Sequence, residues 1–181
     1  MSEIADRYRR RADAFEALID RTPLERWESP SPCEGWLARD IVVHVVRHSA
    51  ETLRDKAGVQ LAPARTELDD PAESFCWVRA AVEAVLDDPN TSTDVAVYLD
   101  AALSFDLPQH WWDLAKATEQ DSTMRPEEVE VLWETLSAMP PEWWKWQVDN
   151  GHYAPAVQVP DDAPLQDRLV ALIGRDPYWT P

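Results

Sequence analysis

Residues 37–56 read LARDIVVHVVRHSAETLRDK, and this stretch sets the expectation for the whole fold. Its apolar side chains recur at steps of three and four residues, the spacing that keeps them on one face of an α-helix. The charged side chains fall in the opposite sector. The apolar set is Leu37, Ile41, Val42, Val45, Val46 and Leu53, and the charged set is Asp40, Arg47, Glu51 and Arg54. The pattern predicts an amphipathic helix with one buried and one solvated face.

The same periodicity recurs along the chain, and it predicts the main helices of the fold. The expected long helices cover residues 2–22, 37–56, 72–87 and 93–118. A fifth helix starts near Arg125, where a proline and two acidic residues suit a first turn, and Pro140 stops it. The rest is dotted with proline, and we expect it to be extended up to a short last helix at about 164–173.

Glycine is scarce, with 4 residues against 15 prolines, which disfavours folds built from strands and tight turns. We therefore expect an all-α fold with a single domain over residues 1–181. Its architecture would be a four-helix bundle with short extra helices and an irregular C-terminal tail. A chain of this length commonly shares one core.

The charge balance narrows the range of partners. Lys and Arg total 17 against 34 Asp and Glu, so the formal net charge is −17. That balance argues against nucleic acid, whose binding depends on cations that neutralise phosphates, and against anionic membrane surfaces. The beginning of the chain lacks the apolar stretch of a secretory signal. With only two cysteines there is no disulfide framework, and a reducing cytoplasm is the expected location.

Histidine spacing predicts a metal site. Among four histidines, His44 and His48 stand four apart in one predicted helix, and His110 stands four after Asp106 in another. Side chains at i and i+4 project from the same helix face, so two of them can reach one ion. Zinc suits an imidazole and carboxylate set, while nickel, iron(II) and manganese accept the same ligands. The alternative is that the spacing arises by chance and each histidine forms a hydrogen bond with a backbone or carboxylate partner instead of binding a metal.

Cysteine and tryptophan offer weaker signals. Cys33 lies beside Glu34, and a neighbouring carboxylate raises a thiol pKa, so a structural role is favoured over a nucleophilic one. Ten tryptophans are many for this length, and three of them stand in the segment 142–153, EWWKWQVDNGHY. These aromatic side chains either cap the bundle or line a ligand cavity.

Three motifs together resemble a known family. The first is SPSPCEGW at 29–36 followed by ARDIVVH at 38–44, and the second is DLPQHWWDLAKAT at 106–118. The third is the ending PDDAPLQDRLVALIGRDP at 160–177. In combination they are similar to the mycothiol-dependent maleylpyruvate isomerase N-terminal domain, within the DinB-like metal-binding superfamily, and the tail resembles one group of small single-domain members.

The resemblance implies a four-helix bundle that holds a divalent metal through His44, Asp106 and His110. His48 matches no usual ligand and becomes a supporting group or a cavity wall. The sequence departs from the pattern at three places. Pro108 stands between two expected ligands, where a proline kink would separate them. The residue after His110 is the bulky Trp111, and the segment 142–153 is unusually aromatic. These departures suggest a pocket adapted to a flat apolar ligand, with Trp111, Trp144, Trp146 and His152 beside the metal.

Two functions remain open, and a third reading treats the metal site as vestigial in an interaction domain. In the first, the protein is a metal-dependent enzyme that binds a low-molecular-weight thiol of the mycothiol type and performs S-transfer or isomerisation, with His48 or His152 moving protons. In the second, it is a binding module for a metal or an aromatic ligand without turnover, with a specialised or engineered Trp-rich pocket.

We also expect a homodimer, because relatives often pair and exposed tryptophans commonly mark interfaces.

Overall fold

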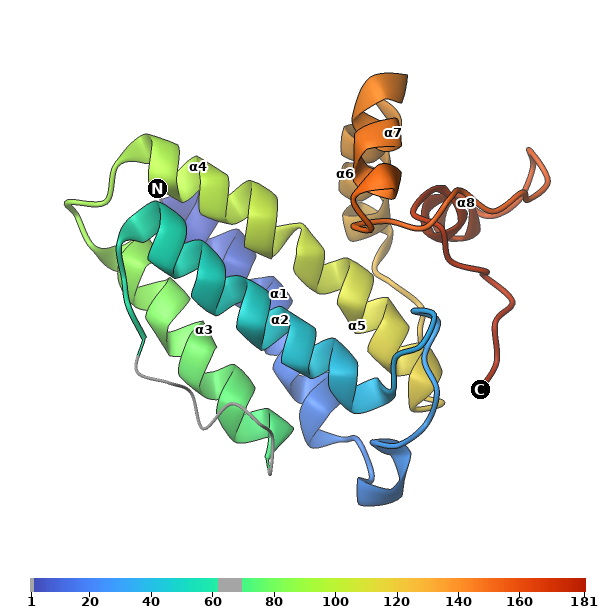
Figure 1. Cartoon of the computed structure of the whole chain (residues 1–181), viewed down its shortest axis with the longest axis horizontal. Coiled ribbons are helices and arrows are strands. Elements are labelled where there is room, and N and C mark those ends of the chain that lie inside the picture. Colours follow the sequence, from blue (N-terminus) through green and yellow to red (C-terminus); the bar gives the residue numbers. More distant parts are fainter. Residues whose placement is uncertain (1, 62–69) are drawn as a thin grey trace.

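The computed structural model describes residues 2–61 and 70–181, and over this part of the chain the fold is all-α (Figure 1). No β-strand occurs among these residues, where the only ladder contact is an isolated bridge between Pro30 and Leu37. The predicted fold class is thereby confirmed. The helices are α1 (Ser2–Asp20), α2 (Ala38–Thr52), α3 (Pro71–Asp87), α4 (Thr93–Leu99), α5 (Asp106–Ala117), α6 (Pro126–Ser137), α7 (Pro141–Asp149) and α8 (Leu165–Leu172).

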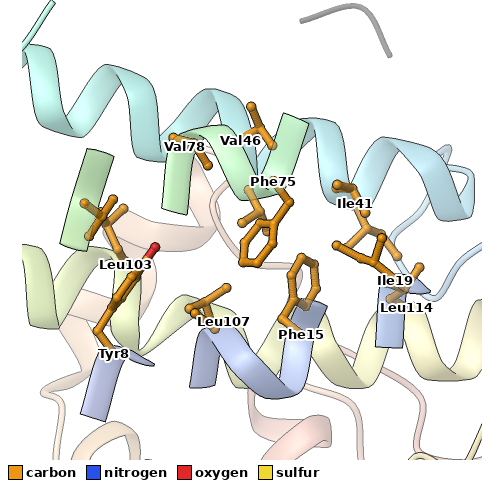
Figure 2. Close-up of a cluster of buried hydrophobic side chains, with 14 of the residues drawn as sticks. Tyr8, Phe15, Ile19, Ile41, Val46, Phe75, Val78, Leu103, Leu107 and Leu114 are labelled. Carbon is orange, nitrogen blue, oxygen red and sulfur yellow. The ribbon is translucent and has the colours of Figure 1, made fainter. Parts of the chain in front are cut away.

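The main core lies between α1, α2, α3 and the α4–α5 run. Helix α1 contacts α3 and α5, and α2 contacts the same two helices. Phe15 of α1 and Phe75 of α3 meet edge to face, with ring centroids 5.0 Å apart, and Tyr8, Leu103 and Leu107 continue the cluster (Figure 2). Burial of this apolar surface is the main force holding the four segments together. It also sets α2 alongside α5.

A second, smaller core joins the C-terminal third of the chain to α5. Helices α6, α7 and α8 lie together beyond one flank of α5 (Figure 1). Trp112, only 2% exposed, packs there with Leu132 of α6 and Leu169 of α8. Trp111 is half-buried and packs against both cores. Helix α5 is therefore shared by the two clusters, and one of its faces remains for polar side chains.

The run from α4 to α5 is interrupted by one π-helical turn, Asp100–Ser104, just before Pro108. In an α-helix the carbonyl of Ser104 would accept the N–H of residue 108, which proline lacks. Here the guanidinium of Arg11 replaces that donor, because its Nη1 lies 3.0 Å from the Ser104 carbonyl and 3.1 Å from its hydroxyl. The missing backbone hydrogen bond is thus satisfied from α1.

One element differs from the sequence expectation. The stretch after Pro140 was expected to be extended, but Pro141–Asp149 forms helix α7. Pro141 takes the first helical position, where its fixed φ favours a helix and its missing N–H costs nothing. An ion pair between Lys145 and Asp149, one turn apart, supports the last turn. The double proline therefore ends α6 and also begins α7.

Among the described residues, no helix combines the length and apolar character needed to span a membrane.

Candidate metal centre

The three predicted ligands meet where α2 crosses the beginning of α5. His44 comes from α2, and Asp106 and His110 come from consecutive turns of α5. One donor atom of each lies within 4.8 Å of the other two. His44 Nε2 is 3.8 Å from Asp106 Oδ2, and His110 Nε2 is 3.5 Å from Asp106 Oδ1. The structure therefore brings these three side chains to one point, a grouping that could hold a metal ion.

Pro108 does not pull the grouping apart. A kink at this position was expected to separate Asp106 from His110, yet their nearest donor atoms lie 3.5 Å apart. The physical reason is the π-turn at Asp100–Ser104, which absorbs the disruption before the ligands begin.

His110 is fixed by a buried carboxylate on its far side. Its Nδ1 lies 3.0 Å from Asp113 Oδ2, and Asp113 is fully buried. A carboxylate accepts, so we assign the proton to Nδ1, which directs Nε2 toward Asp106. A carboxylate behind a ligating histidine sets the tautomer and orientation of the ring. Asp113 thus prepares His110 to donate its Nε2 lone pair.

Arg175, from the C-terminal tail, neutralises Asp113. Its Nη2 donates to Asp113 Oδ2 at 3.0 Å and its Nε to Oδ1 at 3.2 Å, in a two-pronged ion pair. Burial alone would raise the pKa of Asp113, but the charge of Arg175 and the hydrogen bond to His110 hold that pKa well below its usual range. The carboxylate therefore stays ionised behind the ring.

A second grouping, formed by Cys33, His110 and Asp113, shares His110 with the first. Arg175 stands in the way of a cation there, because its Nη2 lies 3.3 Å from Cys33 Sγ and also binds Asp113. Burial and the charge of Asp113 raise the pKa of the Cys33 thiol, which disfavours the thiolate a metal needs. The grouping of His44, Asp106 and His110 is the better metal site.

The pKa values of His44 and His110 are shifted in opposite directions. Burial, followed by the nearby His110, lowers the pKa of His44 to about 4, so its imidazole is neutral at pH 7. Burial would also lower the pKa of His110, but the charge of Asp106 and the hydrogen bond to Asp113 outweigh it and raise that pKa to about 10. The His110 ring is therefore protonated at pH 7, whereas the His44 ring is neutral.

The rings of Trp36 and His48 pack against the candidate ligand histidines. Trp36 lies 5.0 Å from the His44 ring and stacks at 6.2 Å on His110, centroid to centroid. His48 stacks parallel to His44 at 5.7 Å, and its Nε2 reaches the Ala102 carbonyl at 3.3 Å. A carbonyl only accepts, so His48 donates there and is engaged beside the ligand. His48 therefore supports His44 from the side.

The other predicted pocket residues separate into three places. Trp111 faces a cavity next to Pro108 and Met124. Trp144 packs on Trp143 and on Tyr153, with centroids 4.9 and 5.4 Å apart. Trp146, 55% exposed, stacks on the exposed His152 at 5.2 Å. Their assignment to a pocket beside the metal stays a prediction.

Sequence reasoning missed four groups around the site. Trp36 stood in a quoted motif without a role, and Asp113, three residues after His110, was detectable from helical spacing. Arg175 and Tyr153 come from distant segments that no local pattern connects to α5. The pKa of Tyr153 is raised, first by burial and then by the charge of Asp106.

Comparisons with known proteins identify relatives but no family. Proteins from two strains of Mycobacterium tuberculosis, both described as uncharacterized, are each 26% identical to this chain over 177 residues. The alignment covers 93% of this chain and 95% of each relative, so the similarity extends over nearly the whole length. No protein-family model matches the chain, and no solved structure matches it. The chain is thus similar to these mycobacterial proteins throughout, and its function has to be argued from the site.

Proposed function

We propose that this protein binds one divalent metal ion through His44, Asp106 and His110 and uses it in a reaction of a low-molecular-weight thiol. The observation that carries the proposal is the meeting of the three donors within 4.8 Å, with His110 oriented by a buried carboxylate. Zinc fits this donor set best, and nickel, iron(II) and manganese accept it. The proposal includes membership of the DinB-like superfamily, which rests on the sequence motifs.

The charge of the donor set favours an anionic fourth ligand. Two neutral imidazoles and one carboxylate contribute a single negative charge, which leaves a bound divalent ion with one positive charge. Three protein ligands and one open position are typical of catalytic rather than structural sites. A metal lowers the pKa of a coordinated thiol and supplies a thiolate at neutral pH. S-transfer or isomerisation by a thiol of the mycothiol type is therefore the reaction class we propose.

The chain's own residues would have distinct roles. Asp113 and Arg175 orient His110, while Trp36 and His48 hold the His44 ring from two sides. Tyr153 packs on Trp144, and burial together with the charge of Asp106 raises the pKa of its hydroxyl, so that hydroxyl stays protonated and able to donate a hydrogen bond.

The proposal is tested by metal analysis and by cobalt substitution. Purified protein should hold about one equivalent of divalent metal, and the variants His44→Ala and His110→Ala should lose it at neutral pH. His152→Ala is the matched control, because His152 is exposed, stacks on Trp146 and is not among the three grouped donors. Thiol titration of the cobalt form should produce sulfur-to-cobalt charge-transfer absorption. Stoichiometric metal in His44→Ala would refute the site.

A binding module without turnover is the second candidate. The aromatic rings favour it, since Trp36 stacks on the ligand His110 and Trp144 packs against Tyr153. Rings of this kind can hold a flat ligand. The cobalt experiment separates the two functions: metal binding with no thiol-dependent absorption, together with binding of an aromatic ligand, would favour the module over the enzyme.

A further inference from the structure

A cavity lies on a different face of α5 from His110 and Asp106. Its apolar lining comes from Pro108 and Trp111 of α5, Ala14 of α1, and Met124. Its volume is about 140 Å³. The side chains of these four residues are apolar except for the indole N–H, and they include one indole ring and one thioether, while Thr123 adds a hydroxyl to the lining. Such a lining suits an aromatic ring, which gains from stacking and sulfur contacts.

The volume limits the occupant to one ring. An apolar protein cavity of roughly 150 Å³ accommodates benzene. Drug-sized ligands need pockets of about 300 Å³ or more, so a fused-ring cofactor is excluded from this cavity. The ligand must therefore be small, with an apolar part the size of a single six-membered ring.

The charges at the rim favour an anion. Arg10, Arg11 and Arg125 line the cavity together with one carboxylate, Glu128. Glu128 is already engaged, because Arg11 Nη2 lies 2.7 Å and Arg125 Nη2 lies 3.4 Å from its oxygens. Arg10 is exposed and has no ion-pair partner within the part of the chain that the structure describes. Arg125 Nε also lies 3.3 Å from Glu127, so three cations against these two carboxylates leave one positive charge here, in a chain whose net charge is −17.

We propose that this cavity binds a small monocyclic aromatic carboxylate, with its ring between Pro108, Trp111 and Met124 and its carboxylate at Arg10. The apolar lining favours an aromatic ring, and the volume limits the ligand to a single ring. The unpaired guanidinium of Arg10 favours a carboxylate. The site is separate from the metal centre and does not depend on the function proposed there. It requires no rearrangement of Arg11 or Glu128, whose ion pair forms part of the wall.

The test uses benzoate as the probe and the methionine methyl groups as reporters. In a spectrum of the protein carrying ¹³C-methyl methionine, benzoate should shift the Met124 signal in a saturable way through its ring current. Met139 lies outside the cavity lining and should not respond. Benzyl alcohol supplies the ring without the charge, and acetate supplies the charge without the ring, so both should bind more weakly than benzoate.

Variants separate the charge from the cavity. Arg10→Gln should weaken benzoate roughly tenfold, as expected for loss of a hydrogen bond to a charged group, and leave benzyl alcohol unchanged. Arg21→Gln removes the same charge from an exposed arginine outside the cavity and should leave benzoate unchanged. Ala14→Phe should fill the space and abolish both. Equal losses in the two arginine variants, an acetate shift as large as that of benzoate, or no Met124 response would overturn the proposal.

Discussion

At the scale of single residues, the buried pair of Asp113 and Arg175 determines how His110 is presented. Asp113 and His110 lie on α5, whereas Arg175 lies in the tail, 62 residues after Asp113. The helical spacing of Asp106 and His110 correctly predicted that they share one face of a helix. It could not predict Arg175, because a contact between α5 and the C-terminal tail leaves no periodic trace in either segment. The meeting of Asp106 and His110 on one face was therefore predictable, and the charge of Arg175 that neutralises Asp113 behind His110 was not.

Replacing Asp113 by Asn should destabilise the protein by about 3–5 kcal/mol, because it leaves Arg175 as a buried charge without its counter-ion. Arg175 is only 8% exposed, so water cannot replace the lost partner. Denaturant unfolding at pH 7 measures the change. The control is Asp149→Asn, which breaks the exposed pair with Lys145 and should cost below about 1 kcal/mol. Similar small losses in both variants would contradict this role of Asp113.

Metal binding at pH 8 should release one proton, and His110 should be its source. The pKa of His110 is raised to about 10, so its ring carries an extra proton at that pH, whereas the pKa of His44 is lowered to about 4 and its ring is already neutral. Metal affinity should accordingly rise about tenfold per pH unit between pH 5 and 9. Calorimetry in two buffers of different ionisation enthalpy counts the protons. Release of none, or of two, would refute this assignment.

At the scale of elements, the sequence predicted where helices lie better than how they are joined. The expected helix at 93–118 is three pieces, α4, a π-turn and α5, because Pro108 cannot donate and the chain widens one turn before it. The expected helix at 37–56 likewise ends in a π-turn at Leu53–Ala57. Helix α7 was missed because prolines can begin a helix as well as stop one. The spacing of apolar residues predicts which helix face is buried. It does not predict turns whose hydrogen bonds are made with residues of other segments.

The link between Arg11 and the π-turn can be tested by a double-mutant cycle. Arg11→Met should cost about 2–4 kcal/mol, since it leaves the buried Ser104 carbonyl without its donor and Glu128 without its partner. In the background of Pro108→Ala, residue 108 regains an N–H that can reach the Ser104 carbonyl, so the same substitution should cost less. Unfolding free energies of the four proteins give the coupling. Strictly additive losses would show that Arg11 does not substitute for the missing N–H.

At the scale of the whole molecule, the homodimer expected from the sequence remains a prediction. Trp146 is 55% exposed on α7, and a large exposed aromatic of this kind is enriched at interfaces. Sedimentation velocity at micromolar concentration should show a species of twice 20.7 kDa, and Trp146→Ser should shift it toward the monomer. A single 20.7 kDa species for the unaltered protein would rule the dimer out.

The excess of carboxylates over cationic side chains affects the stability of the whole molecule. Even if each of the 17 cationic side chains paired with one carboxylate, 34 − 17 = 17 carboxylates would remain uncompensated. Arg79 illustrates the shortage, because this single guanidinium pairs with Asp13, Glu16 and Glu83. Unpaired like charges repel one another in the compact state, and salt screens that repulsion, with a Debye length of about 8 Å at 0.15 M.

The melting temperature should therefore rise when NaCl is increased from about 10 mM to about 150 mM, because the screened repulsion exceeds the weakened surface ion pairs. KCl should have the same effect at equal ionic strength, which separates screening from specific ion binding. Thermal unfolding followed by circular dichroism provides the measurement. As a charge control, Asp13→Asn removes one of the three acids around Arg79 and should reduce the salt effect slightly. A melting temperature that falls steadily with salt would mean that the ion-pair network, rather than the excess of carboxylates, dominates the electrostatic free energy of folding.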